Sequence, residues 1–401
     1  MNRSRRLIFI LGGVFVALLV AVGIGRAVYL SRSAAGSACS QPNTQTASLQ
    51  TLKAAHHYEY VVPDGSMYVY DVDHGYQLVK HINLPTKGVR GVVASPATCM
   101  LYISYGGNGT SHGTGSLLAY NLLTDAVLWS KNYPFGIDSM SIAPDGKTIY
   151  MPDGSLSYDG NVYVLAASDG HVTKTINTRP GASTHNTIVS SNGAHIYIGA
   201  TDNKYLYQAD AATNQIIKRI GPMLAGVRPF TINGKETLAF TNATDFIGFQ
   251  VSSITTGKVL YTVPVKGFKT PKEGLSHGIS LSPDEKEIYL IDAPNSYAHV
   301  FDVSGLPATA PKQVADIRLT PMTGLEAPCA YDCGKEGWIE HSRDGRFVYV
   351  GDSGDVIDTT SRTIIAHLPA LSNSRKYLEI DWANGMPIFT TNRHGIGYVT
   401  T

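Results

Sequence analysis

The sequence predicts an all-β protein, a seven-bladed β-propeller built from four-stranded blades. One strand–turn–strand pattern recurs seven times between residues 85 and 390, and its clearest copies are Asp138–Asp153 and His277–Asp292. Gly fills 40 and Pro 20 of the 401 positions, whereas charged residues are 16%. This composition suits many short strands joined by tight turns.

The first 30 residues predict a membrane anchor or signal segment. Three arginines (Arg3, Arg5 and Arg6) precede the apolar run 7–25, which is long enough to cross a bilayer as a helix. The positive charges favour the cytoplasmic side and therefore export of the remainder. The alternative is a cleaved signal peptide, because small residues follow at Ala35–Ala38. The run exceeds the usual signal core of about 7–15 residues, which favours the anchor.

We therefore expect a single-pass protein of the cell membrane, with the propeller on the extracytoplasmic side, or a secreted protein if the signal is cleaved. Residues 31–55 are rich in Ser, Ala, Thr and Gln, a composition typical of a flexible linker. Residues 56–401 then form the propeller.

The charge and the cysteines restrict the partners. The formal net charge is +1 and no basic run follows the first six residues, so a nucleic-acid partner is not expected. Export permits disulfides, and Cys329 and Cys333 are close enough in sequence to close a small loop. No Cys-x-x-Cys-His is present, which argues against covalent haem.

The second repeat shows the expected order of strands within a blade. Strands are expected at 139–143, 148–151, 161–166 and 171–176, with turns at Pro144-Asp-Gly146 and Ser168-Asp-Gly170. Asp-Gly between alternating runs is a strong hairpin signal. The second strands of the seven blades are predicted at 101–105, 148–151, 195–199, 237–240, 287–290, 347–350 and 387–390.

The N-terminal segment 58–84 is expected to complete the last blade and to close the ring. It contains an expected third strand, 67–72, and fourth strand, 77–84, but no first strand precedes them. Residues 395–401 also resemble a third strand. The predicted closure therefore has about one strand too many, and its register stays open.

The repeat resembles the YVTN-type β-propellers, which are exported bacterial proteins. The resemblance rests on Ala143-Pro-Asp-Gly-Lys-Thr-Ile-Tyr150, Ser282-Pro-Asp-Glu-Lys-Glu-Ile-Tyr289 and Ser342-Arg-Asp-Gly-Arg-Phe-Val-Tyr349. It covers residues 57–401 and implies the fold more strongly than a function. Relatives of this kind include surface-layer-like proteins, lactonases and propellers that bind redox cofactors.

The aligned turns place one residue of each blade at the rim of the central channel. The ligand-binding candidates at these positions are Arg90, Asp138, His185, Arg228, His277, Trp338 (after Gly337) and Lys376. Arginine and lysine suit a carboxylate or phosphate. The two histidines suit a base or a metal ligand, and Asp138 would orient one of them. The alternative is that the rim is polar only because it is wet.

Two glutamates are expected deeper in the channel. Glu340 and Glu379 lie two residues further along adjacent first strands, and we expect them to face the same channel. They would pair with Arg375 or Lys376, or hold a divalent metal ion. His341 falls on the opposite parity and is interpreted as a structural histidine.

The function predicted from these residues is a ligand-binding or protein-interaction module with a cationic channel mouth, which would accept a small anionic ligand. The insertion 304–335 would form a flap on one face. The alternative is a lactonase-like hydrolase, with His185 or His277 as general base and Asp138 as a further catalytic candidate. A redox-cofactor propeller is a weaker alternative. Whether the chain is an enzyme stays open.

Overall fold

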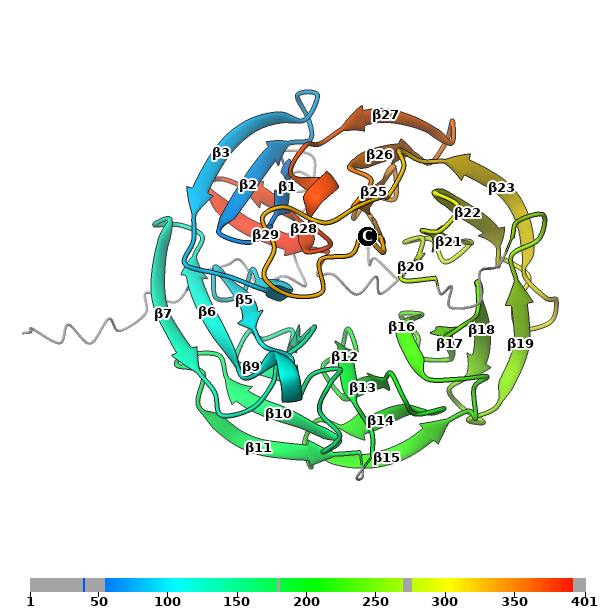
Figure 1. The fold of residues 1–401 in the computed structure, drawn as a ribbon, viewed down its shortest axis with the longest axis horizontal. Coiled ribbons are helices and arrows are strands. Elements are labelled where there is room, and N and C mark those ends of the chain that lie inside the picture. The colour runs from blue at the N-terminus through cyan, green and yellow to red at the C-terminus, as the bar shows by residue number, and fades with distance from the viewer. Residues whose placement is uncertain (1–38, 40–54, 179–180, 270–275, 392–401) are drawn as a thin grey trace, which may run out of the picture. The chain divides into compact units, whose positions relative to one another are not determined.

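The computed structural model describes residue 39 and residues 55–178, 181–269 and 276–391. These residues form a seven-bladed β-propeller, which confirms the predicted fold (Figure 1). The apolar run 7–25, most of the predicted linker and the segment 395–401 lie outside the described residues. Within the described part of the chain, no helix is long and apolar enough to cross a membrane.

Six blades are each built from four consecutive antiparallel strands. Blade 1 contains β4 (Val89–Ser95), β5 (Met100–Gly106), β6 (Gly115–Asn121) and β7 (Ala126–Asn132); blade 2 contains β8 (Ser141–Ile142), β9 (Thr148–Pro152), β10 (Asn161–Ala166) and β11 (Val172–Asn177); blade 3 contains β12 (Thr184–Val189), β13 (His195–Ala200), β14 (Leu206–Asp210) and β15 (Gln215–Ile220). Blade 4 contains β16 (Val227–Ile232), β17 (Leu238–Ala243), β18 (Gly248–Ser253) and β19 (Val259–Pro264); blade 5 contains β20 (Ile279–Leu281), β21 (Glu287–Asp292), β22 (Tyr297–Asp302) and β23 (Lys312–Arg318); blade 6 contains β24 (Trp338–His341), β25 (Phe347–Gly351), β26 (Asp355–Asp358) and β27 (Thr363–His367). Two short 3-10 helices, η2 (Thr110–His112) and η3 (Leu371–Asn373), lie in connecting loops.

The seventh blade joins the two ends of the described propeller, as predicted. Its strands are β28 (Tyr377–Ala383), β1 (His56–Val61), β2 (Ser66–Asp71) and β3 (Gln77–Asn83), in that spatial order. Pairing the first strand of the ring with the last leaves no open gap in the circle of blades.

The prediction that residues 387–390 form the second strand of this blade was wrong. Residues 387–390 belong to β29 (Met386–Thr390), which pairs with the opposite edge of β28, and β1 takes the second position. The strand β1 pairs with β28 along its whole length without a break, whereas the pairing of β29 shifts register between Asp381 and Trp382. The strand β29 therefore lies at the inner edge of the blade, next to β4, and the expected strand 395–401 lies outside the described residues.

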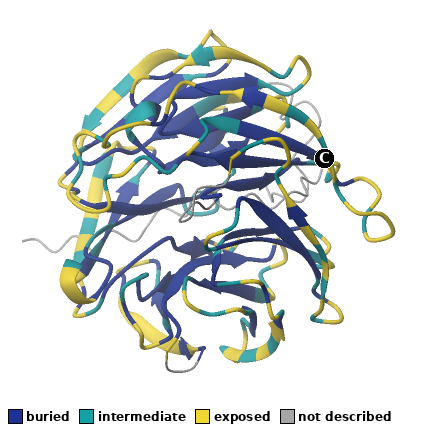
Figure 2. Cartoon of the chain, turned by 45° about the vertical axis from the view of Figure 1, so that its right-hand side comes forward, coloured by how far each residue is buried: buried dark blue, intermediate teal, exposed yellow. Residues whose placement is uncertain are grey.

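The core is divided among the interfaces between blades. Successive side chains of a strand point to opposite faces of its sheet, and each face of an inner strand packs on a neighbouring blade. The seven apolar clusters each join two adjacent blades. The inner strands β4 and β12 are consequently buried along their whole length, whereas the outer strands β3 and β27 are largely exposed (Figure 2).

Two disulfides are present. The expected pair Cys329–Cys333 is formed, and Cys39 pairs with Cys99. The sequence analysis did not assign the second pair, because 60 residues separate its members and no local spacing indicates the bond.

The expectation that Glu340 and Glu379 face the channel was wrong, because inner-strand side chains point to neighbouring blades rather than to the axis. Leu378 and Ile380 pack in the core between blades 7 and 1, so Glu379 points to blade 6, where its Oε2 atom accepts a hydrogen bond from the Tyr349 hydroxyl at 3.2 Å. Its expected pairing with Arg375 is also not observed, because Arg375 bonds other carboxylates.

A third buried glutamate lies in the same interface. Glu59 is directly opposite Glu379 on the neighbouring strand and is fully buried. Neither oxygen of its carboxyl group has a hydrogen-bond partner among the described residues. Burial first, and then the charges of Glu379 and Glu340, raise the pKa of Glu59 well above its ordinary value. The native protein therefore keeps a proton on Glu59 to a higher pH than an unfolded chain does.

We predict that Glu59→Gln stabilises the protein at alkaline pH. A raised carboxyl pKa contributes stability at low pH that is lost as the pH rises through the folded-state pKa. The neutral amide removes this loss, and we expect a gain of about 1–3 kcal/mol at pH 9, the usual cost of an uncompensated buried polar group. Urea unfolding of wild type and variant at pH 5 and pH 9 measures the difference. An equal effect at both pH values would contradict a titrating Glu59.

Candidate functional site

The inner strands bring most of the predicted rim residues to one end of the propeller axis. Arg90, His185 and Arg228 are the second residues of β4, β12 and β16, and Asp138 and His277 lie just before β8 and β20. The inner strands of adjacent blades lie side by side around the axis. Their first residues therefore meet at the same end of the ring.

Asp138 is the acid of this group, and its side chain is buried. Its Oδ2 atom lies 2.9 Å from the His185 Nδ1 atom and 3.6 Å from the Arg90 Nη2 atom. The backbone N–H of Ser139 donates to Oδ1 at 2.9 Å and that of Ser155 donates to Oδ2 at 3.2 Å. Burial alone would raise the pKa of Asp138, but His185 and Arg90 outweigh it and hold that pKa well below its ordinary value. The carboxylate is therefore an anion that fixes both neighbours.

Burial lowers the pKa of both histidines, which favours their neutral forms, and the two rings make different contacts. For His185 burial outweighs the opposite effect of Asp138, and for His277 the charges of Arg228 and Arg375 add to the effect of burial. His277 Nδ1 donates to the Gly337 carbonyl at 3.0 Å, and its Nε2 accepts from the Arg228 Nη2 atom at 3.3 Å. The two imidazole rings are 6.3 Å apart. Asp138 bonds the Nδ1 atom of His185, which leaves the Nε2 atom as the base.

Arg375, rather than Lys376, is the cation that blade 7 adds to this group. Its guanidinium bonds Glu326 at 2.8 Å and Glu336 at 2.9 Å, and lies 3.5 Å from Asp352. Burial raises the pKa of Glu326 to about 7, and the charges of Arg375 and of the buried Lys376 oppose that rise. The alignment of turns carries an error of about one residue. In blade 7 the alignment gave Lys376, whereas the neighbouring residue Arg375 bonds Glu336.

The remaining predicted position, Trp338, is a packing residue as well as a neighbour of the site. Its indole is almost fully buried in the core between blades 6 and 7. Its ring meets the His277 ring edge-on at 5.9 Å. The contact fixes the orientation of His277.

A loop from the predicted flap covers this end of the axis. We call residues 324–336, between β23 and β24, the acidic loop. The segment folds back on itself, because Leu325 pairs with Gly334 and the Glu326 N–H donates to the Cys333 carbonyl. In Figure 1 the gold-to-orange chain between β23 and β24 reaches over the centre of the ring.

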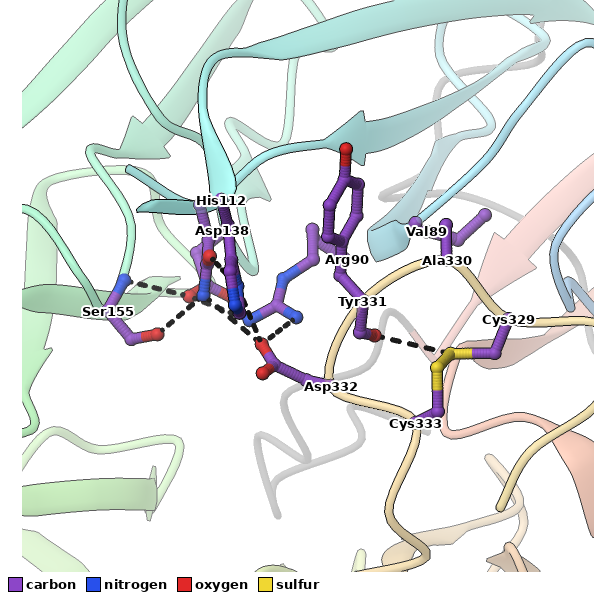
Figure 3. A network of polar contacts seen from close by, with 12 residues as sticks. Val89, Arg90, His112, Asp138, Ser155, Cys329, Ala330, Tyr331, Asp332 and Cys333 are labelled. Atoms are coloured by element: carbon purple, nitrogen blue, oxygen red, sulfur yellow. Dashed lines mark hydrogen bonds and ion pairs between the residues drawn. A yellow bond between two sulfur atoms is a disulfide. The ribbon is translucent and has the colours of Figure 1, made fainter. Parts of the chain in front are cut away.

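Three carboxylates of the acidic loop bind the cations at the axis: Glu326, which is 13% exposed and bonds Arg375, and the more exposed Asp332 and Glu336. Asp332 Oδ2 lies 2.7 Å from the Arg90 Nη1 atom and accepts from the Asn108 amide at 3.3 Å (Figure 3). Glu336 Oε2 lies 2.9 Å from Arg375, 3.2 Å from Arg228 and 3.5 Å from the His277 Nδ1 atom. We call the cations, histidines and Asp138 together the axial cluster: Arg90, Asp138, His185, Arg228, His277 and Arg375.

Three contacts hold the tip of the acidic loop. The Cys329–Cys333 disulfide closes it. The Ala330 N–H donates to Asp64 Oδ2 at 2.8 Å, and Asp64 also accepts from the N–H groups of Gly88 and Val89. The Tyr331 ring stacks on His112 at 5.5 Å and covers Gly88, where a Cβ atom would lie 2.3 Å from it.

Sequence reasoning missed the acids that the cations bind. The signal was present, because Glu326, Asp332 and Glu336 all lie in the insertion that carries the cysteine pair. The alignment of repeats places only residues that recur in every blade. It therefore does not predict which face of the propeller the insertion covers or which residues it contacts. Asp64 and Asp352, which bind backbone N–H groups at the tip and at the C-terminal end of the loop, were missed because their partners lie in that insertion.

The described residues hold no group of three or more His, Cys, Asp or Glu side chains arranged to bind a metal ion. The fold and site define the class of this protein as a seven-bladed β-propeller with a cationic cluster at its axis. No protein-family model matches the chain, and no curated protein is significantly similar to it in sequence.

We predict that Asp138→Asn destabilises the protein far more than Asp332→Asn. Both acids bind Arg90, but Asp138 is 2% exposed and Asp332 is 43% exposed. Removing the charge of a buried partner costs about 3–5 kcal/mol, whereas an exposed ion pair contributes about 0–1 kcal/mol. Urea unfolding at pH 7 measures both values. Equal losses would contradict the larger contribution of the buried Asp138.

Proposed function

We propose that the axial cluster is the binding site of a small carboxylate ligand, and that the propeller is a binding module rather than a scaffold alone. The observation that carries this proposal is that Arg90, Arg228 and Arg375 each bind a carboxylate of the acidic loop. Carboxylates are thus the chemical group that these side chains select. Propellers commonly serve as binding or interaction modules, so the fold agrees with this function.

The burial of the two partners supports ligand binding over a purely structural role. The side chains of Arg90 and Arg375 are 9% and 6% exposed, whereas the acids above them, Asp332 and Glu336, are 43% and 42% exposed. The cations therefore form a fixed layer, and the acids form a layer in contact with solvent. A dissolved carboxylate reaches the cations by replacing the outer layer alone.

The location of the protein is part of the proposal. We propose an exported propeller held at the cell membrane by its N-terminal segment, with secretion after signal cleavage as the alternative. The two disulfides support an oxidising compartment. The resemblance to YVTN-type propellers supports the same location. A protein partner would use the outer loops and leave the axial cluster to the small ligand.

A second candidate function, hydrolysis of a lactone, is favoured by the Asp138–His185 pair. The 2.9 Å contact fixes the imidazole through Nδ1, and Nε2 is then the base. In such a reaction Nε2 takes a proton from water as the oxygen attacks the carbonyl carbon, and Arg228 stabilises the oxyanion. The ring C–O bond then breaks, the leaving oxygen takes the proton back, and the product is a hydroxy acid.

We predict that Arg228→Gln weakens carboxylate binding at least about tenfold, because charge-assisted hydrogen bonds contribute about 1.5–3 kcal/mol each. Isothermal titration of the full chain with succinate measures the dissociation constant. Arg219→Gln, which removes an exposed arginine of the outer strand β15, is the matched control and should bind as wild type does. Absence of binding by wild type and by every variant would refute the proposed function.

For the hydrolase we predict that His185→Gln lowers kcat/KM for lactone hydrolysis by about 100-fold or more, the usual contribution of a general base. Because burial lowers the pKa of His185, the base form persists in acid, and the wild-type rate should fall only below about pH 6.5, the ordinary histidine value. A pH series on a panel of lactones measures both. Wild-type hydrolysis equal to that in buffer would exclude this candidate.

A further inference from the structure

We infer that the acidic loop is an internal ligand of the axial cluster, and that the external ligand which displaces it is a dicarboxylate. This inference rests on the proposed function and adds to it the class of ligand and the way in which access to the site is controlled.

The cations form two separate carboxylate subsites. The first consists of Arg90 and Asn108 and holds Asp332. The second consists of Arg228 and Arg375 and holds Glu336. Asp332 and Glu336 each occupy one subsite through a single oxygen atom, whereas Glu326, the third acid of the loop, is 13% exposed and bonds Arg375 from the side of the blades' own acids. The pattern that the axial cluster recognises is therefore two carboxylates on one molecule.

A ligand with one carboxylate competes poorly with this loop. It fills one subsite, but the second loop acid stays bound and keeps the loop in place. A ligand with two carboxylates replaces both acids at once, and the second contact is then made within one molecule at a high effective concentration. The arrangement therefore discriminates between monocarboxylates and dicarboxylates.

The departure of Asp332 and Glu336 does not strand a buried charge, provided that the less exposed Glu326 stays on Arg375. Arg90 keeps Asp138 at 3.6 Å, and Arg375 keeps Asp352 at 3.5 Å. These two acids belong to the blades, not to the loop, and each is at most 2% exposed. Buried charges that lose every partner carry a large penalty, and the inner acids prevent that penalty when Asp332 and Glu336 leave.

The tip of the acidic loop sets how strongly it competes. The disulfide holds Cys329 and Cys333 together, so that Ala330 reaches Asp64 and Tyr331 reaches His112 while Asp332 reaches Arg90. A bound internal ligand raises the apparent dissociation constant of an external one in inverse proportion to the open fraction. Without the disulfide the tip gains conformational freedom, and the loop competes less well.

The experiment is a titration of the full chain with succinate and with acetate. We expect the double variant Asp332→Asn/Glu336→Gln to bind succinate about tenfold more tightly than wild type, within the 5–150-fold range typical of such coupling. Cys329→Ser/Cys333→Ser should change the affinity in the same direction. Asp169→Asn/Asp284→Asn, which removes two exposed charges far from the axial cluster, is the matched control and should bind as wild type does.

A second measurement follows the loop itself. Lys335 lies within the acidic loop, and trypsin cleavage after it should be faster when succinate is bound, because displacement exposes the backbone. Acetate at the same concentration should leave the cleavage rate unchanged. Cys39→Ser/Cys99→Ser controls for the general loss of a disulfide.

The outcomes separate the two proposals. If wild type and the Asp332→Asn/Glu336→Gln variant bind succinate equally and Lys335 is cleaved at the same rate throughout, the internal-ligand inference is wrong while the carboxylate site stands. Equal affinities for acetate and succinate in wild type would overturn the dicarboxylate assignment. If no variant binds either compound, the proposed function fails and the inference fails with it.

Discussion

The pairing of β1 with β28 is the contact on which the rest of the structure depends. Each blade buries both faces of its inner strands against its neighbours, and the seven apolar clusters lie in the interfaces between blades. A ring that stays open exposes two of those faces to water. The backbone ladder from His56 to Val61 therefore holds together a core whose parts are individually small. It also brings Glu59 opposite Glu379, and burial together with this proximity raises the pKa of Glu59 and favours its neutral form.

Closure of the ring also creates the site. Seven inner strands that start at the same end of an axis bring their first residues into a small region, whatever those residues are. In this chain the result is an excess of cations, with Arg90, Arg228 and Arg375 approaching one another. Buried cations need acids. The blades supply Asp138 and Asp352, which are nearly inaccessible to solvent, and the insertion between blades 5 and 6 supplies the remainder.

The repeat predicted much of this arrangement and failed where the chain departs from the repeat. The turns located Arg90, Asp138, His185, Arg228 and His277 at equivalent positions, because spacing within a blade is fixed by hairpin geometry. The position in blade 7 was displaced from Arg375 to Lys376, because that blade is assembled from both ends of the chain. The acids of the insertion could not be placed, because their positions depend on long-range ion pairs that no local pattern encodes. The faces of Glu340 and Glu379 were misjudged for a geometrical reason, since propeller strands present their side chains to neighbouring blades.

The difference between the two sets of acids explains how one cluster serves both stability and binding. An ion pair contributes to stability when its desolvation is already complete and its geometry is fixed by backbone contacts, as Asp138 is by the N–H groups of Ser139 and Ser155. An ion pair suits exchange when one partner keeps its contact with water, as Asp332 and Glu336 do. Because Arg90 contacts Asp138 as well as Asp332, and Arg375 contacts Glu326 and Asp352 as well as Glu336, the outer acids Asp332 and Glu336 leave without loss of the inner ones. The cations are thereby held in place for a ligand before it arrives, which lowers the entropic cost of binding it.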